Sequence, residues 1–178
     1  MATAFTTKIE KYISDYIATI AKVGGANLDP DLSTNQQLLS TDYGYGILQQ
    51  ERKLGALVRV EYVLKEKNED AGGMGDGGRD EWAYGRILVH GLSKLNTSPR
   101  AAGIDAKMID QVTFLHLLGK GPGDTGFQSS TTPAREFAEI LNHLRTEYWI
   151  SSDTGTDNTF VGMFTQTWQV NGQALGIA

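Results

Sequence analysis

In this 178-residue chain, the glycines of the stretch 119–126 have the spacing that is most similar to a cofactor-binding motif. Gly121, Gly123 and Gly126 keep the G-x-G-x-x-G spacing that lets backbone amides at a helix N-terminus approach a pyrophosphate. In a dinucleotide fold the helix opens at these glycines, whereas here the next helix signal comes six residues later. No Gly-Lys-Ser/Thr sequence closes a Walker A loop. A small nucleotide-binding domain using this loop is therefore an alternative function and not the leading one.

Other residue types that could perform catalysis or bind metals are scattered along the chain. The histidines, His90, His116 and His143, fall in three separate segments, so only the fold could assemble them into a metal site. The absence of cysteine removes disulfides, thiolate nucleophiles and cysteine-bound metals. The sequence contains no Gly-x-Ser-x-Gly, Ser-x-x-Lys or His-Glu-x-x-His motif. We therefore expect no enzymatic activity, no catalytic residues, no metal and no cofactor.

Composition narrows the class of protein further. A length of 178 residues fits one domain spanning 1–178, and 40% hydrophobic with 21% charged residues is typical of a globular chain. A net charge of −5 argues against binding to the surface of DNA or RNA. No apolar run approaches the roughly 20 residues of a membrane span, and the N-terminus lacks a signal-peptide layout. We expect the chain to stay in the cytosol of its host cell.

Residues 57–65 and 82–90 are the predicted arms of a long β-hairpin. Val58, Val60 and Tyr62 alternate with charged residues in the first arm, which is the period of a half-buried strand. The second arm has apolar residues on both faces, so we place it centrally in the sheet.

The segment that joins the arms, residues 68–81, contains five glycines and few apolar side chains. Ordering so many glycines costs entropy that no buried surface offsets, so we expect a flexible excursion in the isolated chain. The alternative is an arm that lies on a neighbouring subunit. The spacing of its aspartates does not match a calcium loop.

Two amphipathic helices are predicted to pack on the sheet. The first covers residues 8–22, with apolar residues at three- and four-residue steps and a capping box formed by Thr7 and Glu10. The second begins with Thr132 as N-cap and Pro133 as first helical residue, and its apolar stripe continues to residue 148.

The remaining segments give weaker signals. We expect residues 105–118 to form a short helix and then a strand at 112–118, with one longer helix as the alternative. Residues 159–170 alternate as a strand, 119–132 form a second extended loop, and 171–178 form a flexible tail.

Before the hairpin, residues 35–39 are predicted to form one helical turn. Tyr43 and Tyr45 alternate with glycines in an ordered loop or short edge strand, where they either contact a partner or cap the core. The expected inter-subunit contact residues are Tyr43, Tyr45, Gly72, Gly73, Met74, Asp76 and Arg79.

These elements together predict an α+β fold. Its mainly antiparallel sheet is built on the long hairpin and packed by one N-terminal helix and one helix in the C-terminal half.

This order of elements resembles the small α+β tail terminator and neck (head-to-tail joining) proteins of long-tailed bacteriophages. In that family the hairpin arms correspond to central strands, and residues 68–81 would reach the neighbouring subunit. The resemblance implies a non-enzymatic virion protein that assembles in the host cytoplasm into a ring, usually a hexamer. Its partners would be further copies of itself and other tail and neck proteins, without a membrane.

In the same family, DNA passes through the ring lumen without sequence-specific binding. Members are often shorter than this chain, and residues 96–132 exceed what the simple pattern needs. A capsid decoration protein or a tail tube subunit is the second alternative, because both share the glycine-rich, cysteine-free, lattice- or ring-forming character.

Overall fold

The computed structural model describes residues 5–20, 22–23, 37–44, 56–66, 84–118, 141–153 and 159–171. In chain order the elements are α1 (Phe5–Ile17), β1 (Lys22–Val23), β2 (Gln37–Tyr43), β3 (Ala56–Glu66), β4 (Tyr84–Leu92), α2 (Pro99–Leu118), β5 (Leu141–Asp153) and β6 (Thr159–Asn171). The strands form one sheet in the order β1-β2-β3-β4-β6-β5. The predicted α+β class is confirmed.

The hairpin of β3 and β4 occupies the middle of this sheet, as predicted. β3 pairs antiparallel with β4 from Leu57 opposite Leu92 to Glu66 opposite Tyr84, with a register shift between Tyr62 and Leu64. β4 then pairs antiparallel with β6, and β6 with β5. Among the described strands, β2 and β3 form the one parallel pair. The predicted strand at 159–170 is therefore confirmed as β6, and the mainly antiparallel character follows from these pairings.

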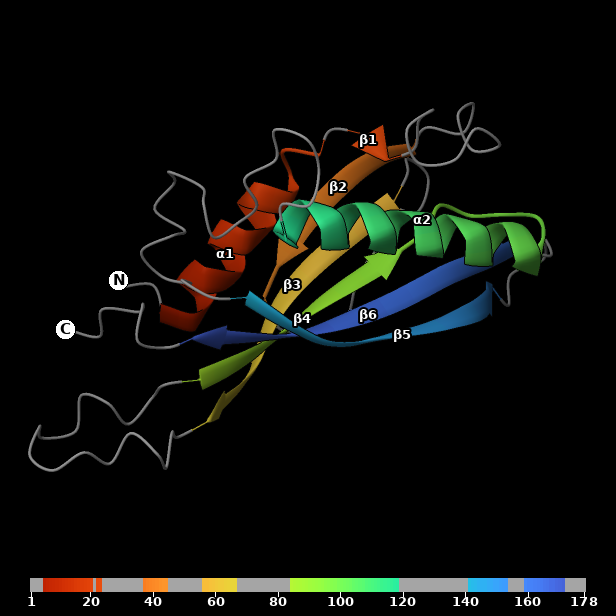
Figure 1. Cartoon of the computed structure of the whole chain (residues 1–178). Helices are drawn as coiled ribbons and strands as arrows, with labels where there is room; N and C mark the ends of the chain where they lie inside the picture. Colours follow the sequence, from red (N-terminus) through yellow and green to blue (C-terminus); the bar gives the residue numbers. More distant parts are fainter. Residues whose placement is uncertain are drawn as a thin grey trace, which may run out of the picture.

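Both helices lie on the same face of the sheet (Figure 1). α1 covers β2 and β3, while α2 runs over β4, β6 and β5. Alternate strand residues point toward the helices and close a core between the two layers. Its fully buried members include Ile9, Ile13, Ile17, Val58, Val60, Ile87, Val89, Ile109, Phe164 and Trp168.

The N-terminal helix is shorter at its C-terminal end than predicted. α1 begins at Phe5 and ends at Ile17, and Lys22 belongs to β1. The predicted capping box is wrong, because Thr7 and Glu10 lie inside the helix. Glu10 instead accepts a hydrogen bond from the backbone amide of Tyr62 at 2.8 Å, which ties α1 to β3.

The predicted strand at 112–118 is wrong. Residues 99–118 form one helix, so the alternative of a single longer helix is correct. Ser98 caps its start by accepting the amide of Ala101 at 3.1 Å, and Pro99 takes the first helical position. The apolar run that suggested a strand is the part of the helix where Thr113 and Leu117 face the core while Phe114 packs on Trp168.

The predicted helix at 133–148 is also wrong over its described part, because residues 141–153 form β5. The apolar residues of this segment have the spacing of a helix, but the segment pairs with β6 instead. The register of that pairing runs from Leu141 opposite Val170 to Asp153 opposite Thr159. Pairing with an already buried strand overrides local helix preference. Residues 133–140 lie outside the described part of the chain.

The predicted helical turn at 35–39 is wrong from Gln37 onward, since β2 begins there. Tyr43 ends β2, and only the two-residue β1 lies beyond β2 in the sheet. The predicted loops 68–81 and 119–132, and the tail beyond Asn171, lie outside the described residues.

Candidate functional site

The edge strand β5 carries the largest concentration of exposed apolar side chains among the described residues. It is 13 residues long and lies at the end of the sheet, pairing with β6 alone among the described strands. Leu144, Tyr148, Trp149 and Ile150 are each 43–46% exposed. A long edge presents unpaired backbone amides and carbonyls to solvent, and apolar residues beside them favour pairing with another chain.

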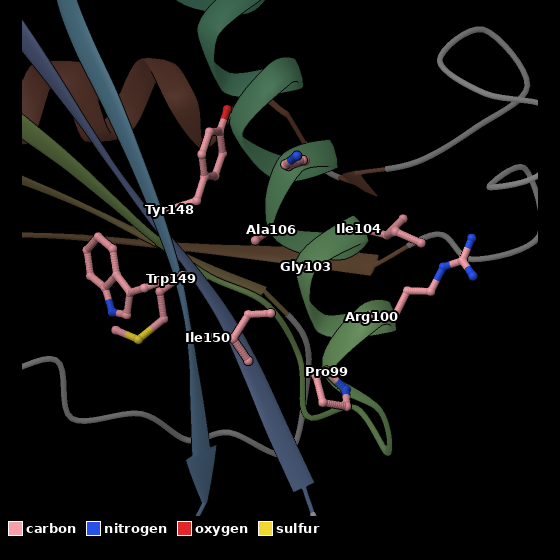
Figure 2. A pocket seen from close by; sticks show the side chains of 10 residues that line it. Pro99, Arg100, Gly103, Ile104, Ala106, Tyr148, Trp149 and Ile150 are labelled. Atoms are coloured by element: carbon pink, nitrogen blue, oxygen red, sulfur yellow. The ribbon is translucent and has the colours of Figure 1, made fainter.

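The register with β6 decides which of these side chains face the helices. Tyr148 and Ile150 lie opposite Phe164 and Gly162, on the face that α2 covers. Figure 2 shows Tyr148 and Ile150 directed toward α2 and Trp149 on the other side of the strand. Leu144 falls at a register shift between His143 and Arg145, where β5 bulges away from regular pairing.

A groove of about 510 Å³ lies between the first half of α2 and this part of β5. It is open to solvent. Most of its lining is apolar and comes from Pro99, Gly103, Ile104, Ala106, Tyr148, Trp149, Ile150 and Met163. A methyl group on Gly103 would lie 3.5 Å from Ile150 Cδ1, an ordinary contact, so the lining at this point leaves room for a small side chain.

Two cations, Arg100 and Lys107, complete the groove lining. They are two helical turns apart on α2, and within the described part of the chain neither forms an ion pair. The Lys107 ammonium lies 5.6 Å from the centre of the Tyr148 ring, within cation–π range. The acids nearest in sequence on α2, Asp105 and Asp110, are both buried beneath the helix. The accessible charge of the groove is therefore positive.

A chain of hydrogen bonds fixes the groove to the core. The Tyr148 hydroxyl donates to Asp110 Oδ2, and burial together with this bond raises the pKa of Tyr148. Gln166 donates from its amide to Asp110 Oδ1 at 2.6 Å and accepts from the Trp168 indole at 2.9 Å. These bonds hold the Tyr148 side chain against α2, so one wall of the groove is preformed.

A second polar cluster lies on the sheet face away from the helices. His90 on β4 donates from Nε2 to Glu61 Oε2 at 3.0 Å, and its Nδ1 lies 3.1 Å from the Thr165 hydroxyl. Arg59 Nη2 lies 3.4 Å from the same Glu61 oxygen. Burial lowers the pKa of His90, which favours the neutral imidazole.

The order hydroxyl, imidazole, carboxylate is that of a hydrolytic triad. Here, however, the hydroxyl belongs to Thr165 in the middle of β6, only 8% exposed, and Glu61 is shared with Arg59. A nucleophile needs an accessible oxygen with room for a substrate carbonyl beside it. We interpret this cluster as a structural network that satisfies polar groups on the sheet.

The fold does not assemble the three histidines into one site. His116 stacks on Tyr16 with ring centres 4.3 Å apart, and His143 packs edge-on against Phe114 and Trp168. The described residues include no group of three side chains that could hold a metal ion. Neither helix could span a membrane, because α1 and α2 lack the necessary length or apolarity.

The chain matches no protein-family model and no curated protein. The possible role of the β5 edge and its groove therefore follows from their geometry.

Of the predicted contact residues, Tyr43 lies at the end of β2, exposed and on the helix side. Tyr45, Gly72, Gly73, Met74, Asp76 and Arg79 lie outside the described residues.

The exposed surface formed by Tyr148, Trp149 and Ile150 was not predicted from the sequence. The signal was present as three consecutive large apolar residues at the end of a segment, followed by Ser151 and Ser152. Three such residues in a row cannot all face the core from one strand, which leaves at least one exposed. The predicted helix ended at Tyr148 and left Trp149 and Ile150 in the segment after it, so the three were not recognised as part of one strand.

Proposed function

We propose that this chain is a non-enzymatic virion assembly protein of the tail terminator or neck type. It works by self-association into a ring and by docking on other tail and neck proteins. No covalent chemistry is needed for this role, only surfaces that other polypeptides cover.

The observation that carries the proposal is the exposed apolar edge of β5 beside an open groove. Proteins that work alone protect long edges with charge, proline or a covering element, because an open edge invites pairing with other chains. β5 instead exposes Tyr148, Trp149 and Ile150 at successive positions along such an edge. Aromatic and large apolar residues are those that dominate protein–protein contacts.

The difference between the two faces of the sheet supports a ring. α1 and α2 cover one face, whereas no described helix covers the other (Figure 1). Contacts between unlike surfaces of identical subunits are head-to-tail, and they produce a closed ring when the rotation between subunits divides the circle. A ring of this kind leaves a central passage, through which DNA would pass without sequence-specific contacts.

The mass of the purified protein in solution tests the proposal. Light scattering after size exclusion should give a particle several times 19.4 kDa, close to sixfold for a hexamer. Negative-stain electron micrographs of the same fraction should show rings. A nucleotide titration followed by melting temperature serves as the control for the alternative function, and no shift is expected.

A monomer at all concentrations up to the solubility limit would contradict the proposal, as would a nucleotide that raises the melting temperature by several degrees. Rings stacked into long tubes, or copies arrayed on a capsid lattice, would instead favour the tail tube or decoration alternative.

A further inference from the structure

We infer that the groove between α2 and β5 binds an extended segment of a partner protein, which adds to β5 as an extra strand. The segment carries apolar side chains at alternate positions and a carboxylate on the same face. This inference rests on the proposed role of the chain in assembly and names the chemistry of the partner at one surface.

The position of the groove beside an edge strand favours the extended conformation. The groove is lined in part by Tyr148, Trp149 and Ile150 of β5, and a strand added to β5 would run about 4.8 Å from it. The unpaired backbone groups of β5 would then supply the hydrogen bonds, and alternate side chains of the added strand would enter the groove. A helix placed there would leave the backbone groups of β5 unsatisfied.

The groove lining determines which side chains enter. Ile150 and Pro99 form an apolar wall at the start of α2, while Tyr148 and Lys107 lie further along the helix. Residues at alternate positions of one strand are roughly 6.5 to 7 Å apart, which matches neighbouring subsites of this kind. One or two branched apolar side chains fit beside Ile150, and the next position on that face meets Lys107.

Charge complementarity selects a carboxylate for that position. Arg100 and Lys107 are accessible cations without an ion pair in the described part of the chain, although the whole chain has a net charge of −5. The charged residues of β5 on the other face, Arg145 and Glu147, lie 3.7 Å from each other and are balanced. An acidic partner gains attraction on the helix side, and a basic one meets repulsion.

The described strands of a second copy do not have this chemistry. β5 itself presents His143, Thr146, Tyr148 and Ile150 on the helix side, with no carboxylate. At the other end of the sheet, Asp42 of β2 lies on the opposite face, paired with Arg59, and its carboxylate accepts the amide of Tyr43 at 2.8 Å. None of these described strands supplies the carboxylate, so we assign the occupant to a different protein, and the contacts between subunits of the ring then lie on other surfaces.

Binding of two matched hexapeptides tests the inference. The probe acetyl-ETITVT-amide carries one carboxylate and two apolar residues on one face, and acetyl-KTITVT-amide reverses the charge alone. Each is titrated into the full chain in whatever oligomeric state it adopts, and the backbone amide signals of β5 and α2 are followed by NMR. We expect the acidic peptide to shift these signals and to bind about three- to tenfold more tightly than the basic one.

Three variants sharpen the test. Lys107→Glu, at an exposed helical position, should reverse the preference between the two peptides. Ile150→Lys should abolish binding of the acidic peptide, whereas Val63→Lys, at a similarly exposed apolar residue on β3, should leave it unchanged. A general effect of the added positive charge would change the affinity for the acidic peptide equally in Ile150→Lys and Val63→Lys.

Equal binding of both peptides to the unaltered chain and to Lys107→Glu would overturn the assignment of an acidic partner. Absence of binding to a monomeric chain would overturn the groove as a peptide site. If neither peptide binds because a particle buries β5, and Ile150→Lys dissociates that particle, a second copy holds the edge. The inference then fails while the proposed function stands. Conversely, selective binding by a chain that never forms rings would leave the inference intact and remove the ring.

Discussion

Glu61 and His90 face each other across the central strands β3 and β4, with Glu61 Oε2 3.0 Å from His90 Nε2. Burial lowers the pKa of His90 from its ordinary value of 6.5, although Glu61 acts in the opposite direction. The imidazole therefore takes up a proton less readily in the folded chain than in the unfolded one. This difference links the stability of the sheet to pH.

We expect the unfolding temperature to fall as the pH is lowered through 6.5, because the unfolded chain then binds the extra proton and the folded chain does not. His90→Gln should remove part of this fall, since the amide can still donate to Glu61. Thermal unfolding of both proteins at pH 7.5, 6.5 and 5.5 measures the effect, with His116 and His143 unchanged in each. Parallel curves for the two proteins would contradict the prediction.

Glu10 should give a dependence of opposite sign at lower pH. Burial raises the pKa of its carboxyl above 4.5, so the folded chain holds this proton more tightly than the unfolded chain. Stability should therefore decrease as the pH rises above 4.5 through the raised value.

Glu10→Gln keeps an oxygen for the amide of Tyr62 and should flatten this part of the profile. Chemical denaturation of both proteins in closely spaced steps between pH 4 and pH 6 checks it. A Glu10→Gln protein whose stability still declines across that range would show that another group is responsible.

The β-hairpin was predictable because its signal is local. Val58, Val60 and Tyr62 alternate with charged residues, and all three face the helices as the period requires. The position of β4 in the middle of the sheet followed from apolar residues on both of its faces.

Residues 99–118 and 141–153 could not be assigned correctly because distant partners decide them. Thr113 and Leu117 lie on the buried side of a helix only because the sheet lies beneath α2, while β5 forms as the partner of β6. A short apolar run fits the period of a helix and that of a strand equally well, and tertiary contacts then determine which of the two forms. The groove is formed by α2 and β5, so it could not be predicted without them.

The hydroxyl of Tyr148 should contribute measurably to stability, because it donates to the buried carboxylate of Asp110. Tyr148→Phe should lower the free energy of unfolding by about 1 kcal/mol, the usual value for a bond of this kind at a half-exposed position. Tyr43→Phe is the matched control, since its hydroxyl has no hydrogen bond within the described residues and should change nothing. Urea unfolding measures both; equal effects of the two variants would contradict a role for the Asp110 contact.

Gly162 and Gly103 line the same contact between α2 and the strands, yet they should respond oppositely to alanine. A methyl group on Gly162 would overlap the carbonyl of Ala102, a backbone atom that cannot move without displacing α2. Gly162→Ala should therefore lower the free energy of unfolding by about 3 kcal/mol.

A methyl group on Gly103 meets only Ile150 Cδ1 at 3.5 Å, an ordinary contact. Gly103→Ala should instead stabilise the chain by up to about 1 kcal/mol, because alanine has the higher helix propensity. Calorimetry of Gly162→Ala and Gly103→Ala measures both unfolding temperatures. Equal shifts of the same sign would show that α2 does not lie this close to β6.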